Sequence, residues 1–383
     1  MKIRVVHLIT KLEFGGAQQN TLYTVGHLDP ERFEVHLACG PGAYLDSQVM
    51  ELPRHVQTQW LRFLKREVRP WWDFLGFIEL YFYLKRIKPD VIHTHSSKAG
   101  ILGRWAAWLA GVPVIIHCVH GFGFHDFQNP AVRGALAWIE RITARITTQL
   151  VYVSQTNLQY GAKWRIAAEK PAMVIRSGVD LAALDKLGEN EWLQKRRELG
   201  IAPTEMVIAT VGNLKPQKNP GHFIRLAQIC WEQKIQARFL FVGGWEGDKA
   251  REQQILKNAP PNLKYLGWRQ DAAKIIKAGN LFVLTSLWEG LPRSAVEALR
   301  LGVPVVAYAS DGLNEIIEDG KNGFLAPQGN FEALSQQVLR LLKSPAMRDS
   351  MTLAARRSIG PEFDINNMVR RQEELYRQLT VRV

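Results

Sequence analysis

The sequence predicts an α/β protein with two doubly wound parallel sheets. Short apolar runs rich in β-branched residues alternate with longer amphipathic stretches along the whole chain. Near-continuous apolar strands that alternate with helices are typical of parallel sheets covered on both faces. The 383 residues exceed one ordinary core and suit two domains. The alternation pauses at residues 177–200, where a Gly-Val-Asp turn precedes a polar helix, so we expect the domain boundary there.

The expected elements follow one another in a regular order. Helix-length patterns separate most neighbouring strands, for example residues 99–110 and 220–233. The predicted domains are residues 1–178 and 179–365, and a last helix occupies residues 366–383. The candidate strands are residues 4–9, 34–39, 90–95, 113–120, 149–154 and 173–176, then 206–211, 238–242, 262–266, 281–286 and 304–309.

The composition narrows the class of protein and its compartment. A net charge of +13 favours an acidic partner, such as a phosphorylated substrate or an anionic membrane surface. Lys and Arg are spread over both halves, so no nucleic-acid partner is expected. The three cysteines lack any CxxC spacing, which argues against a disulfide framework or a zinc site and favours a reducing compartment. We find neither a signal peptide nor a membrane-spanning segment, so a cytoplasmic protein is expected.

The first loop of interest contains two glycines. Gly15 and Gly16 follow the first strand and open a helix, so bare backbone N–H groups and the helix dipole suit a phosphate. The loop is not GxGxxG, and no acidic residue ends the second strand, which disfavours a nicotinamide cofactor. A merely tight turn is the alternative interpretation.

The second loop carries two lysines. Lys215 and Lys218 lie before Asn219, a good N-cap residue, and Pro220, a good first helical residue. Fixed positive charge beside a helix N-terminus can hold a pyrophosphate without a metal ion. The alternative is a solvated surface loop.

The third segment runs from Glu289 to Glu297. Pro292 fits the first turn of a helix, which leaves nearby backbone N–H groups free for phosphate oxygens. The two carboxylates could accept hydrogen bonds from vicinal sugar hydroxyls. A glycosidase with paired carboxylates is less favoured, because the phosphate site would hold a donor diphosphate beside them. Glu297 and Arg293 could instead form a surface ion pair.

Histidines cluster in the first domain, at positions 93, 95, 117, 120 and 125. His95 and His120 each end a predicted strand, where ligands bind in such sheets. The alternative is a set of packed core histidines. No carboxylate or cysteine at ligand spacing supports a metal, and no metal site is predicted.

Taken in this order, the motifs resemble glycosyltransferase family 4, whose members have the GT-B architecture of two facing Rossmann-like domains with a crevice between them. The resemblance covers essentially the whole chain. The matching segments are Gly15-Gly16-Ala17, His95-Ser96-Ser97-Lys98-Ala99-Gly100, His120-Gly121-Phe122, Ser177-Gly178-Val179-Asp180, Gly243-Gly244, Glu289 to Glu297 and Gly320-Lys321-Asn322-Gly323-Phe324.

The resemblance implies a retaining transfer from a UDP-sugar, with no metal ion and no cofactor. His120, Glu289 and Lys218 take the catalytic positions, and His95 and Lys98 are assigned to the acceptor. The family usually has Arg where this chain has Asn213, and Lys215 is the candidate to supply the missing charge. The last helix is expected to cross back to the first domain. The implied donor-binding residues are Gly15, Gly16, Asn213, Lys215, Lys218, Gly243, Glu289, Gly290, Leu291, Pro292 and Glu297.

The narrower resemblance is to bacterial enzymes of polysaccharide and O-antigen synthesis. It implies a glycan or polyprenyl-diphosphate-linked acceptor. Residues 54–88 mix many aromatic and basic side chains, so we expect peripheral contact with an anionic membrane, on the inner face of the plasma membrane. A UDP-sugar epimerase or phosphorylase of the same fold is the alternative function.

Overall fold

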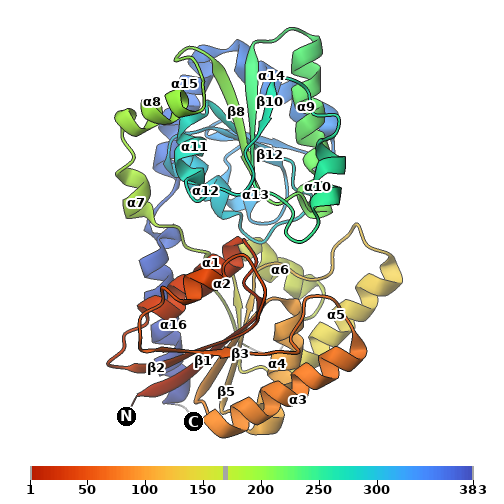
Figure 1. Ribbon diagram of the computed structural model, residues 1–383, viewed down its shortest axis with the longest axis vertical. Helices are drawn as coiled ribbons and strands as arrows, with labels where there is room; N and C mark the ends of the chain where they lie inside the picture. The colour runs from red at the N-terminus through yellow and green to blue at the C-terminus, as the bar shows by residue number, and fades with distance from the viewer. Residues whose placement is uncertain (1, 167–170, 382–383) are drawn as a thin grey trace. The chain divides into compact units, whose positions relative to one another are not determined.

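The computed structural model describes residues 2–166 and 171–381. The chain divides into two compact units. Unit 1 combines residues 1–178 with residues 365–383, and unit 2 is Val179–Asp364 (Figure 1). The chain returns to unit 1 at Ile365, one residue before the expected start of the last helix at residue 366. The structure does not place the two units relative to each other, and each is described by itself.

Unit 1 contains a parallel sheet whose described strands follow the order β3-β2-β1-β4-β5-β6-β7. Strand β3 was not expected, because its polar, partly exposed sequence Val-Gln-Thr-Gln-Trp lacks the apolar run of a central strand. Such a sequence fits its place at the sheet edge. The strands are β1 (Ile3–Lys11), β2 (Phe33–Gly40), β3 (Val56–Trp60), β4 (Val91–His95), β5 (Val114–Val119), β6 (Gln149–Tyr152) and β7 (Ala172–Val174).

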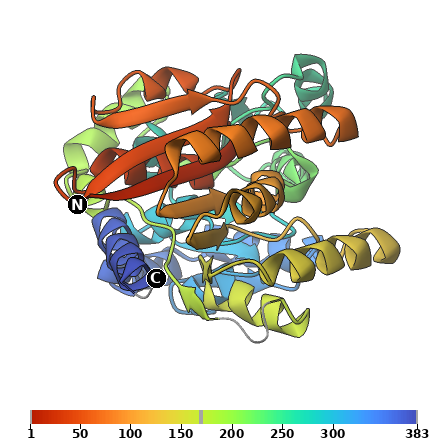
Figure 2. The same ribbon diagram turned by 90° about the horizontal axis from the view of Figure 1, so that it is seen from below.

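The helices of unit 1 cover both faces of this sheet. Helices α3, α4 and α5 pack in a row, which Figure 2 shows in orange to gold. The last helix, α16, lies beside α1, and the Tyr23 hydroxyl donates to Asn366 Oδ1 at 2.8 Å. The helices are α1 (Gly16–His27), α2 (Asp46–Val49), α3 (Pro70–Ile87), α4 (Ser97–Ala110), α5 (Pro130–Ala144), α6 (Gln155–Lys163) and α16 (Ile365–Thr380).

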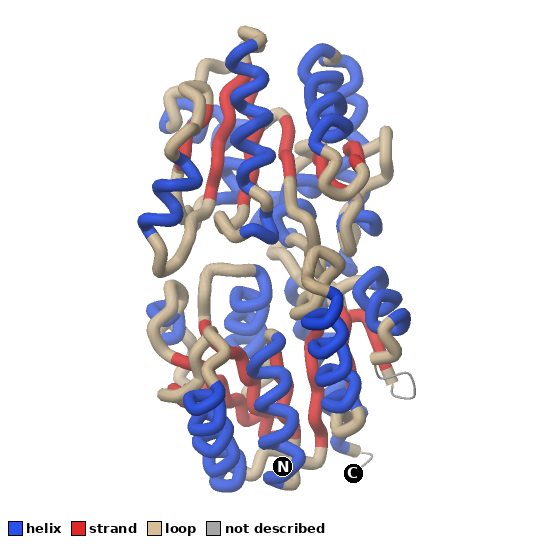
Figure 3. The backbone as a smooth tube through the Cα atoms, turned by 90° about the vertical axis from the view of Figure 1, so that its right-hand side faces the viewer, coloured by secondary structure: helices blue, strands red, loops and turns tan. Residues whose placement is uncertain are grey.

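Unit 2 contains a second parallel sheet, in the order β10-β9-β8-β11-β12-β13. Figure 3 draws the strands of each unit in red. The edge strand β13 was not expected, because it is a short run that begins with glycine. The strands are β8 (Met206–Val211), β9 (Ala237–Val242), β10 (Leu263–Tyr265), β11 (Leu281–Leu284), β12 (Val305–Tyr308) and β13 (Gly323–Ala326). The helices are α7 (Leu181–Asp185), α8 (Glu189–Glu198), α9 (Pro220–Glu232), α10 (Lys249–Leu256), α11 (Ala272–Ala278), α12 (Arg293–Arg300), α13 (Leu313–Ile316), α14 (Phe331–Lys343) and α15 (Pro345–Ser358), with the short 3₁₀ helices η1 (Pro216–Lys218) and η2 (Pro361–Phe363).

The strand order places the predicted loops together. In each sheet the order reverses beside the first strand, so β1 neighbours β4 and β8 neighbours β11. Ligands of doubly wound sheets bind outside the carboxyl ends of strands at this reversal. The loops after β1 and β4 carry Gly15, Gly16 and Lys98, and those after β8 and β11 carry Lys218 and Glu289.

Unit 1 contains a buried ion pair, and unit 2 contains a partly buried group of ion pairs. In unit 1, Arg104 is fully buried and its guanidinium donates to Glu140 Oε1 at 2.6 Å. In unit 2, Asp271 accepts hydrogen bonds from Arg269 and Lys195, each at 2.8 Å. Charged pairs of this kind are costly to break one partner at a time.

Candidate functional site

In unit 2, Lys218 and Glu289 meet although 71 residues separate them in sequence. The Lys218 ammonium donates to Glu289 Oε1 as an ion pair, with both side chains largely buried. The loop after β8 is also fixed to the segment after β11 by the Thr285 hydroxyl, which donates to the carbonyl oxygens of Lys218 at 2.8 Å and Asn219 at 2.9 Å. The structure therefore brings the second and third predicted segments together.

A side chain of the loop after β8 hydrogen-bonds to the backbone of the same loop. The Lys215 N–H donates to Asn213 Oδ1 at 3.2 Å, so the Asn213 side chain shapes the turn. Asn219 occupies the N-cap position of α9, but its side chain makes no capping hydrogen bond and its backbone is left-handed at φ 46°. The expectation of a side-chain cap was therefore wrong. Gly243 lies against this loop with φ 125°, where an added Cβ would stand 1.8 Å from the Gly212 carbonyl oxygen. Only glycine fits at that position.

The segment from Glu289 to Glu297 leads from β11 into α12. The helix begins at Arg293 with Pro292 as its N-cap, so Pro292 lies just before the first turn in which it was expected. Gly290, Leu291 and Pro292 are buried, and the Gly290 carbonyl accepts from the Gly312 N–H at 3.1 Å. The first turn of α12 contains no acidic residue, so its amides can meet an anion.

Glu297 lies on the second turn of α12, four residues after Arg293. The shortest distance between the Arg293 guanidinium and the Glu297 carboxylate is 3.9 Å, longer than a hydrogen bond. Burial raises the pKa of Glu297, and the Arg293 charge opposes this rise. The expected alternative of an i,i+4 ion pair is therefore present, but as a long contact with both side chains largely buried rather than on the surface.

In unit 1, the glycine loop opens α1 as expected. Gly15 is the N-cap residue with no side-chain cap, and Gly16, the first helical residue, is exposed. The first turn of α1 also lacks acidic side chains. These amides thus remain suited to an oxyanion.

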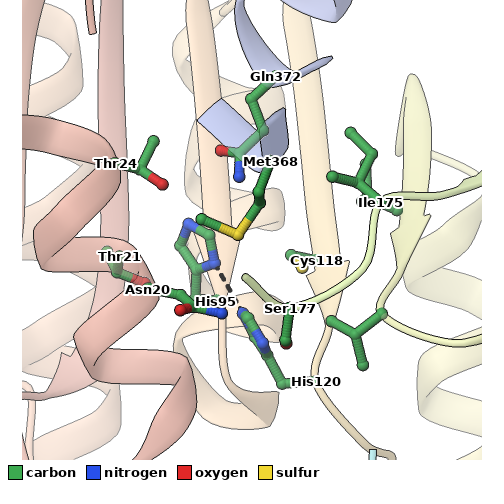
Figure 4. A pocket seen from close by; sticks show the side chains of 12 residues that line it. Asn20, Thr21, Thr24, His95, Cys118, His120, Ile175, Ser177, Met368 and Gln372 are labelled. Carbon is green, nitrogen blue, oxygen red and sulfur yellow. Dashed lines mark hydrogen bonds between the residues drawn. The ribbon is translucent and has the colours of Figure 1, made fainter. Parts of the chain in front are cut away.

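The predicted histidines His95 and His120 are directly hydrogen-bonded to each other. His95 Nδ1 lies 3.1 Å from His120 Nε2 (Figure 4), and His95 Nε2 lies 3.1 Å from His7 Nδ1. Burial lowers the pKa of His7 to about 3 and of His120 to about 4, and lowers the pKa of His95 well below its ordinary value. These rings are therefore neutral at physiological pH.

Two residues of this cluster, His7 and Tyr376, were absent from the sequence-based prediction. His7 pairs with His93 in the register of β1 and β4, and the Tyr376 hydroxyl of α16 lies 2.6 Å from His93 Nδ1. The alternation of His7, His93 and His95 along neighbouring strands was the available signal for His7. Nothing in the sequence pointed to Tyr376, which lies 369 residues away from His7.

Two triads in this region have ligand atoms within 4.8 Å of one another, His7 with His93 and His95, and His95 with Cys118 and His120. Neither triad contains a carboxylate. Both ring nitrogens of His95 already face other histidines. Hydrogen bonds link His7, His95 and His120, whereas Cys118 was not expected at ligand distance from these rings.

Lys98 is tied to the segment before α3. Its ammonium donates to the carbonyl oxygens of Lys65 at 2.8 Å and of Glu67, and it pairs with Asp73. These three contacts use the three donors of an ammonium group. His95 is likewise buried, at 3% exposure. Both residues expected at the acceptor are thus engaged inside unit 1.

The aromatic residues of α3 divide between core and surface. Leu80, Tyr83 and Leu84 are buried in the core of unit 1. Trp71, Phe74 and Phe82 are exposed by 69%, 54% and 64%, and we call these three the aromatic patch. Within residues 2–166 and 171–381, no helix has the length and apolar character needed to cross a bilayer.

Known sequences and structures match both units. The family model described as Glycosyltransferase Family 4 matches residues 14–183, and that described as Glycosyl transferases group 1 matches residues 193–358. An Escherichia coli UDP-Gal:alpha-D-GlcNAc-diphosphoundecaprenol alpha-1,3-galactosyltransferase is 33% identical, with 99% of this chain and 98% of the relative covered. A Campylobacter jejuni N,N'-diacetylbacillosaminyl-diphospho-undecaprenol alpha-1,3-N-acetylgalactosaminyltransferase is 23% identical over 86% of this chain and 91% of the relative.

Solved structures agree on the fold. Anabaena HepE in complex with UDP superposes with a TM-score of 0.78 at 21% identity, covering 99% of this chain and 100% of that one. WaaG, a glycosyltransferase involved in lipopolysaccharide biosynthesis, gives a TM-score of 0.78 at 14% identity, with 98% and 99% covered. The expected GT-B fold class is confirmed. Because a full-length relative is 33% identical and both units match glycosyltransferase models, the chain is a glycosyltransferase and belongs to glycosyltransferase family 4.

Proposed function

We propose that this enzyme transfers a hexose from a UDP-sugar to a polyprenyl-diphosphate-linked glycan during cell-surface polysaccharide synthesis. The observation that carries the proposal is the Lys218–Glu289 pair at the reversal of the β8 and β11 strands, beside the start of α12. The names of the E. coli and C. jejuni relatives both describe diphospho-undecaprenol acceptors, which supports the acceptor class.

The donor site is assigned as follows. The Lys218 ammonium and the amides of Gly290 and Leu291 neutralise the diphosphate, since fixed donors beside a helix N-terminus suit phosphate oxygens. Glu289 binds a hydroxyl of the transferred sugar and Glu297 binds the ribose. Lys215 adds positive charge at a turn shaped by Asn213. Pro292 and the compact Gly243 turn fix the loops, and Gly15 and Gly16 offer the amides of α1 to the diphosphate.

We assign a retaining reaction that needs no metal ion. The bond from the sugar's anomeric carbon to the UDP oxygen breaks as the acceptor oxygen attacks from the same face. The acceptor proton passes to the leaving diphosphate oxygen, and Lys218 balances the growing charge. His120 contacts the transferred sugar. His95 and Lys98 act indirectly, by holding His120 and the segment before α3.

The chemistry is tested with a panel of UDP-galactose, UDP-glucose, UDP-GlcNAc, UDP-GalNAc and GDP-mannose, and an α-GlcNAc-diphospho-lipid acceptor. We expect UDP release to require the acceptor, to survive EDTA, and to give an α-linked product by NMR. Lys218→Ala should lower kcat/KM by roughly 100- to 1,000-fold. UDP release without acceptor, or release that requires phosphate, would favour the epimerase or phosphorylase. A trapped glycosyl–enzyme adduct would refute direct same-face attack.

We also propose that the aromatic patch holds the enzyme on the inner face of the plasma membrane. Exposed aromatics beside basic residues suit the interface of an anionic bilayer, and Lys65 Nζ lies 4.1 Å from the Trp72 ring centre at the start of α3. We expect flotation with liposomes that contain anionic lipid at low salt. Trp71→Ala with Phe74→Ala should lower binding, whereas Trp231→Ala, which removes an aromatic side chain of unit 2 that is 51% exposed, should not. Equal binding by both variants would exclude this surface.

A further inference from the structure

Five polar groups form an unbroken line of hydrogen bonds through unit 1. His120 Nε2 lies 3.1 Å from His95 Nδ1, and His95 Nε2 lies 3.1 Å from His7 Nδ1. His7 Nε2 lies 3.2 Å from the Tyr376 hydroxyl, which donates to Gln372 Oε1 at 3.1 Å. We call these five residues the histidine line. It starts at the end of β5 and ends on α16.

The chemistry at α16 sets the direction of every hydrogen bond in the line. The Gln372 carbonyl oxygen can only accept, so the single Tyr376 proton points toward it. Tyr376 therefore accepts from His7 Nε2–H. A neutral imidazole carries one N–H, so His7 Nδ1 accepts from His95 Nε2–H, and His95 Nδ1 accepts from His120 Nε2–H. His120 Nδ1 is left with a lone pair.

His93 fits the same assignment. Its Nδ1 lies 2.6 Å from the Tyr376 oxygen, which has a second lone pair to accept this N–H. Burial keeps the line in one protonation state, because it lowers the pKa of each histidine and raises the pKa of Tyr376 well above its ordinary value. With one proton on each ring, every hydrogen bond of the histidine line is donated in the same direction, from His120 toward Gln372.

Only one end of the line can meet a ligand. His7 and Tyr376 are fully buried, His95 is 3% exposed and Gln372 is 7% exposed, whereas His120 is partly exposed. A small cavity of about 10 Å³ lies beside the His95–His120 bond, lined in part by both rings and by Gln372 (Figure 4). Any substrate contact of the line therefore passes through His120.

The residues that α16 contributes to the cavity and to the histidine line lie on one face of the helix. Met368, Gln372 and Tyr376 are spaced four residues apart, so they share one face of the helix. All three are buried, and Met368 lines the same cavity as His95 and His120. The helix thus supplies both the wall of the cavity and the acceptor that ends the line.

We propose that Tyr376 and Gln372 are positioning residues that act through His7 and His95 to hold His120 as its Nε2–H tautomer. In this form His120 Nδ1 accepts a hydrogen bond from a hydroxyl of the transferred sugar and donates none. The enzyme would then select donors that present a hydroxyl at this point. The inference rests on the proposed placement of His120 at the sugar.

Removing the Tyr376 hydroxyl removes the group that sets the direction of the hydrogen bonds in the histidine line. His7 Nε2 then has no acceptor, and the line can reverse, with each histidine donating toward His120. His120 would carry its proton on Nδ1, which would meet the sugar hydroxyl as a donor instead of an acceptor. Tyr376→Phe keeps the ring and its volume, so the change is confined to the hydroxyl.

The test compares Tyr376→Phe and Gln372→Leu with the control Tyr83→Phe. Tyr83 is also buried in unit 1, and its hydroxyl lies 3.2 Å from His36 Nδ1, outside the line. Two-bond ¹H–¹⁵N NMR of ¹⁵N-histidine protein reports the tautomer of His120, whose signals are identified by their loss in His120→Ala. We expect Nε2–H in the native enzyme and in the control, and a mixture of tautomers in the two test variants.

Kinetics give the second readout. With the UDP-sugar selected by the panel, kcat/KM should fall about 10- to 100-fold in Tyr376→Phe and Gln372→Leu, and stay within about twofold in Tyr83→Phe. An Nδ1–H tautomer in the native enzyme overturns the proposal, even if both variants fail to fold. So does a loss of activity no greater than in the control. If His120→Ala keeps full activity, the proposed role of His120 fails instead, while the tautomer result still decides the positioning.

Discussion

Acidification should unfold unit 1 selectively, because its buried histidines are neutral in the folded state. His7, His93, His95 and His117 are at most 4% exposed, and burial lowers the pKa of each below the value of about 6.5 for an unfolded chain. For a depressed histidine pKa, the stabilising contribution is complete above pH 6.5 and is lost as the pH falls. The unfolded chain binds protons that the folded unit excludes.

The size of this effect follows from the number of rings. At pH 5.5, each ring whose folded pKa lies well below that pH lowers the free energy of unfolding by about 1.4 kcal/mol. The four rings together remove about 6 kcal/mol, which is comparable to the whole stability of a small domain. Unfolding at pH 5.5 should therefore take up three to four protons, approximately, at these sites.

Calorimetry can measure both the stability and the protons. Unfolding is followed at pH 7.5, 6.5 and 5.5 in buffers of different ionisation enthalpy, which gives proton uptake directly. Unit 2 is the internal control, since His222 is its only histidine among the ten of the chain. Equal pH sensitivity of the two transitions, or uptake of less than about one proton by unit 1, would refute the reasoning.

Three further changes test the charged pairs. Glu289→Gln frees Lys218 from its ion pair, so UDP should bind about tenfold tighter by calorimetry while transfer slows about 100-fold; weaker UDP binding would contradict this. Arg104→Met leaves the buried carboxylate of Glu140 without its ion-pair partner. The free energy of unfolding measured in urea should fall by about 3–5 kcal/mol, and adding Glu140→Leu should restore most of this loss. Hydrogen bonds from Arg269 and then Lys195 hold the pKa of Asp271 well below its usual range. Asp271→Asn should therefore lower stability by about 2 kcal/mol at pH 7, and this difference should shrink as the pH falls below about 4.

The sequence predicted the two parallel sheets because a strand buried on both faces needs a continuous apolar run. The edge strands β3 and β13 were not predicted because neither has such a run. Strand β3 is polar, and β13 is a short segment that begins with glycine. An edge strand is held mainly by its backbone hydrogen bonds, which leave little trace in side-chain pattern.

The sequence predicted where the candidate site lies, but it did not predict which of its side chains contact one another. Lys218 and Glu289 each follow a strand, so both were expected at the same end of the sheet. That they form an ion pair depends on which strands are neighbours, and on the Thr285 contacts that fix the loops. Lys98 shows the opposite outcome. The family resemblance implied an acceptor contact, but the Lys98 ammonium pairs with Asp73 and donates to two carbonyl oxygens.

The return of α16 to unit 1 has a consequence for synthesis of the chain. Unit 2 is encoded between the two segments of unit 1, so all of its residues leave the ribosome before α16 does. Until then, His7 and His93 have no Tyr376 hydroxyl to meet, and a wall of the cavity beside His95 is missing. Unit 2 can close its core while the chain is still growing, whereas unit 1 must wait for almost its last residues. The part of unit 1 that precedes unit 2 in the sequence is thus completed only after unit 2 has been made.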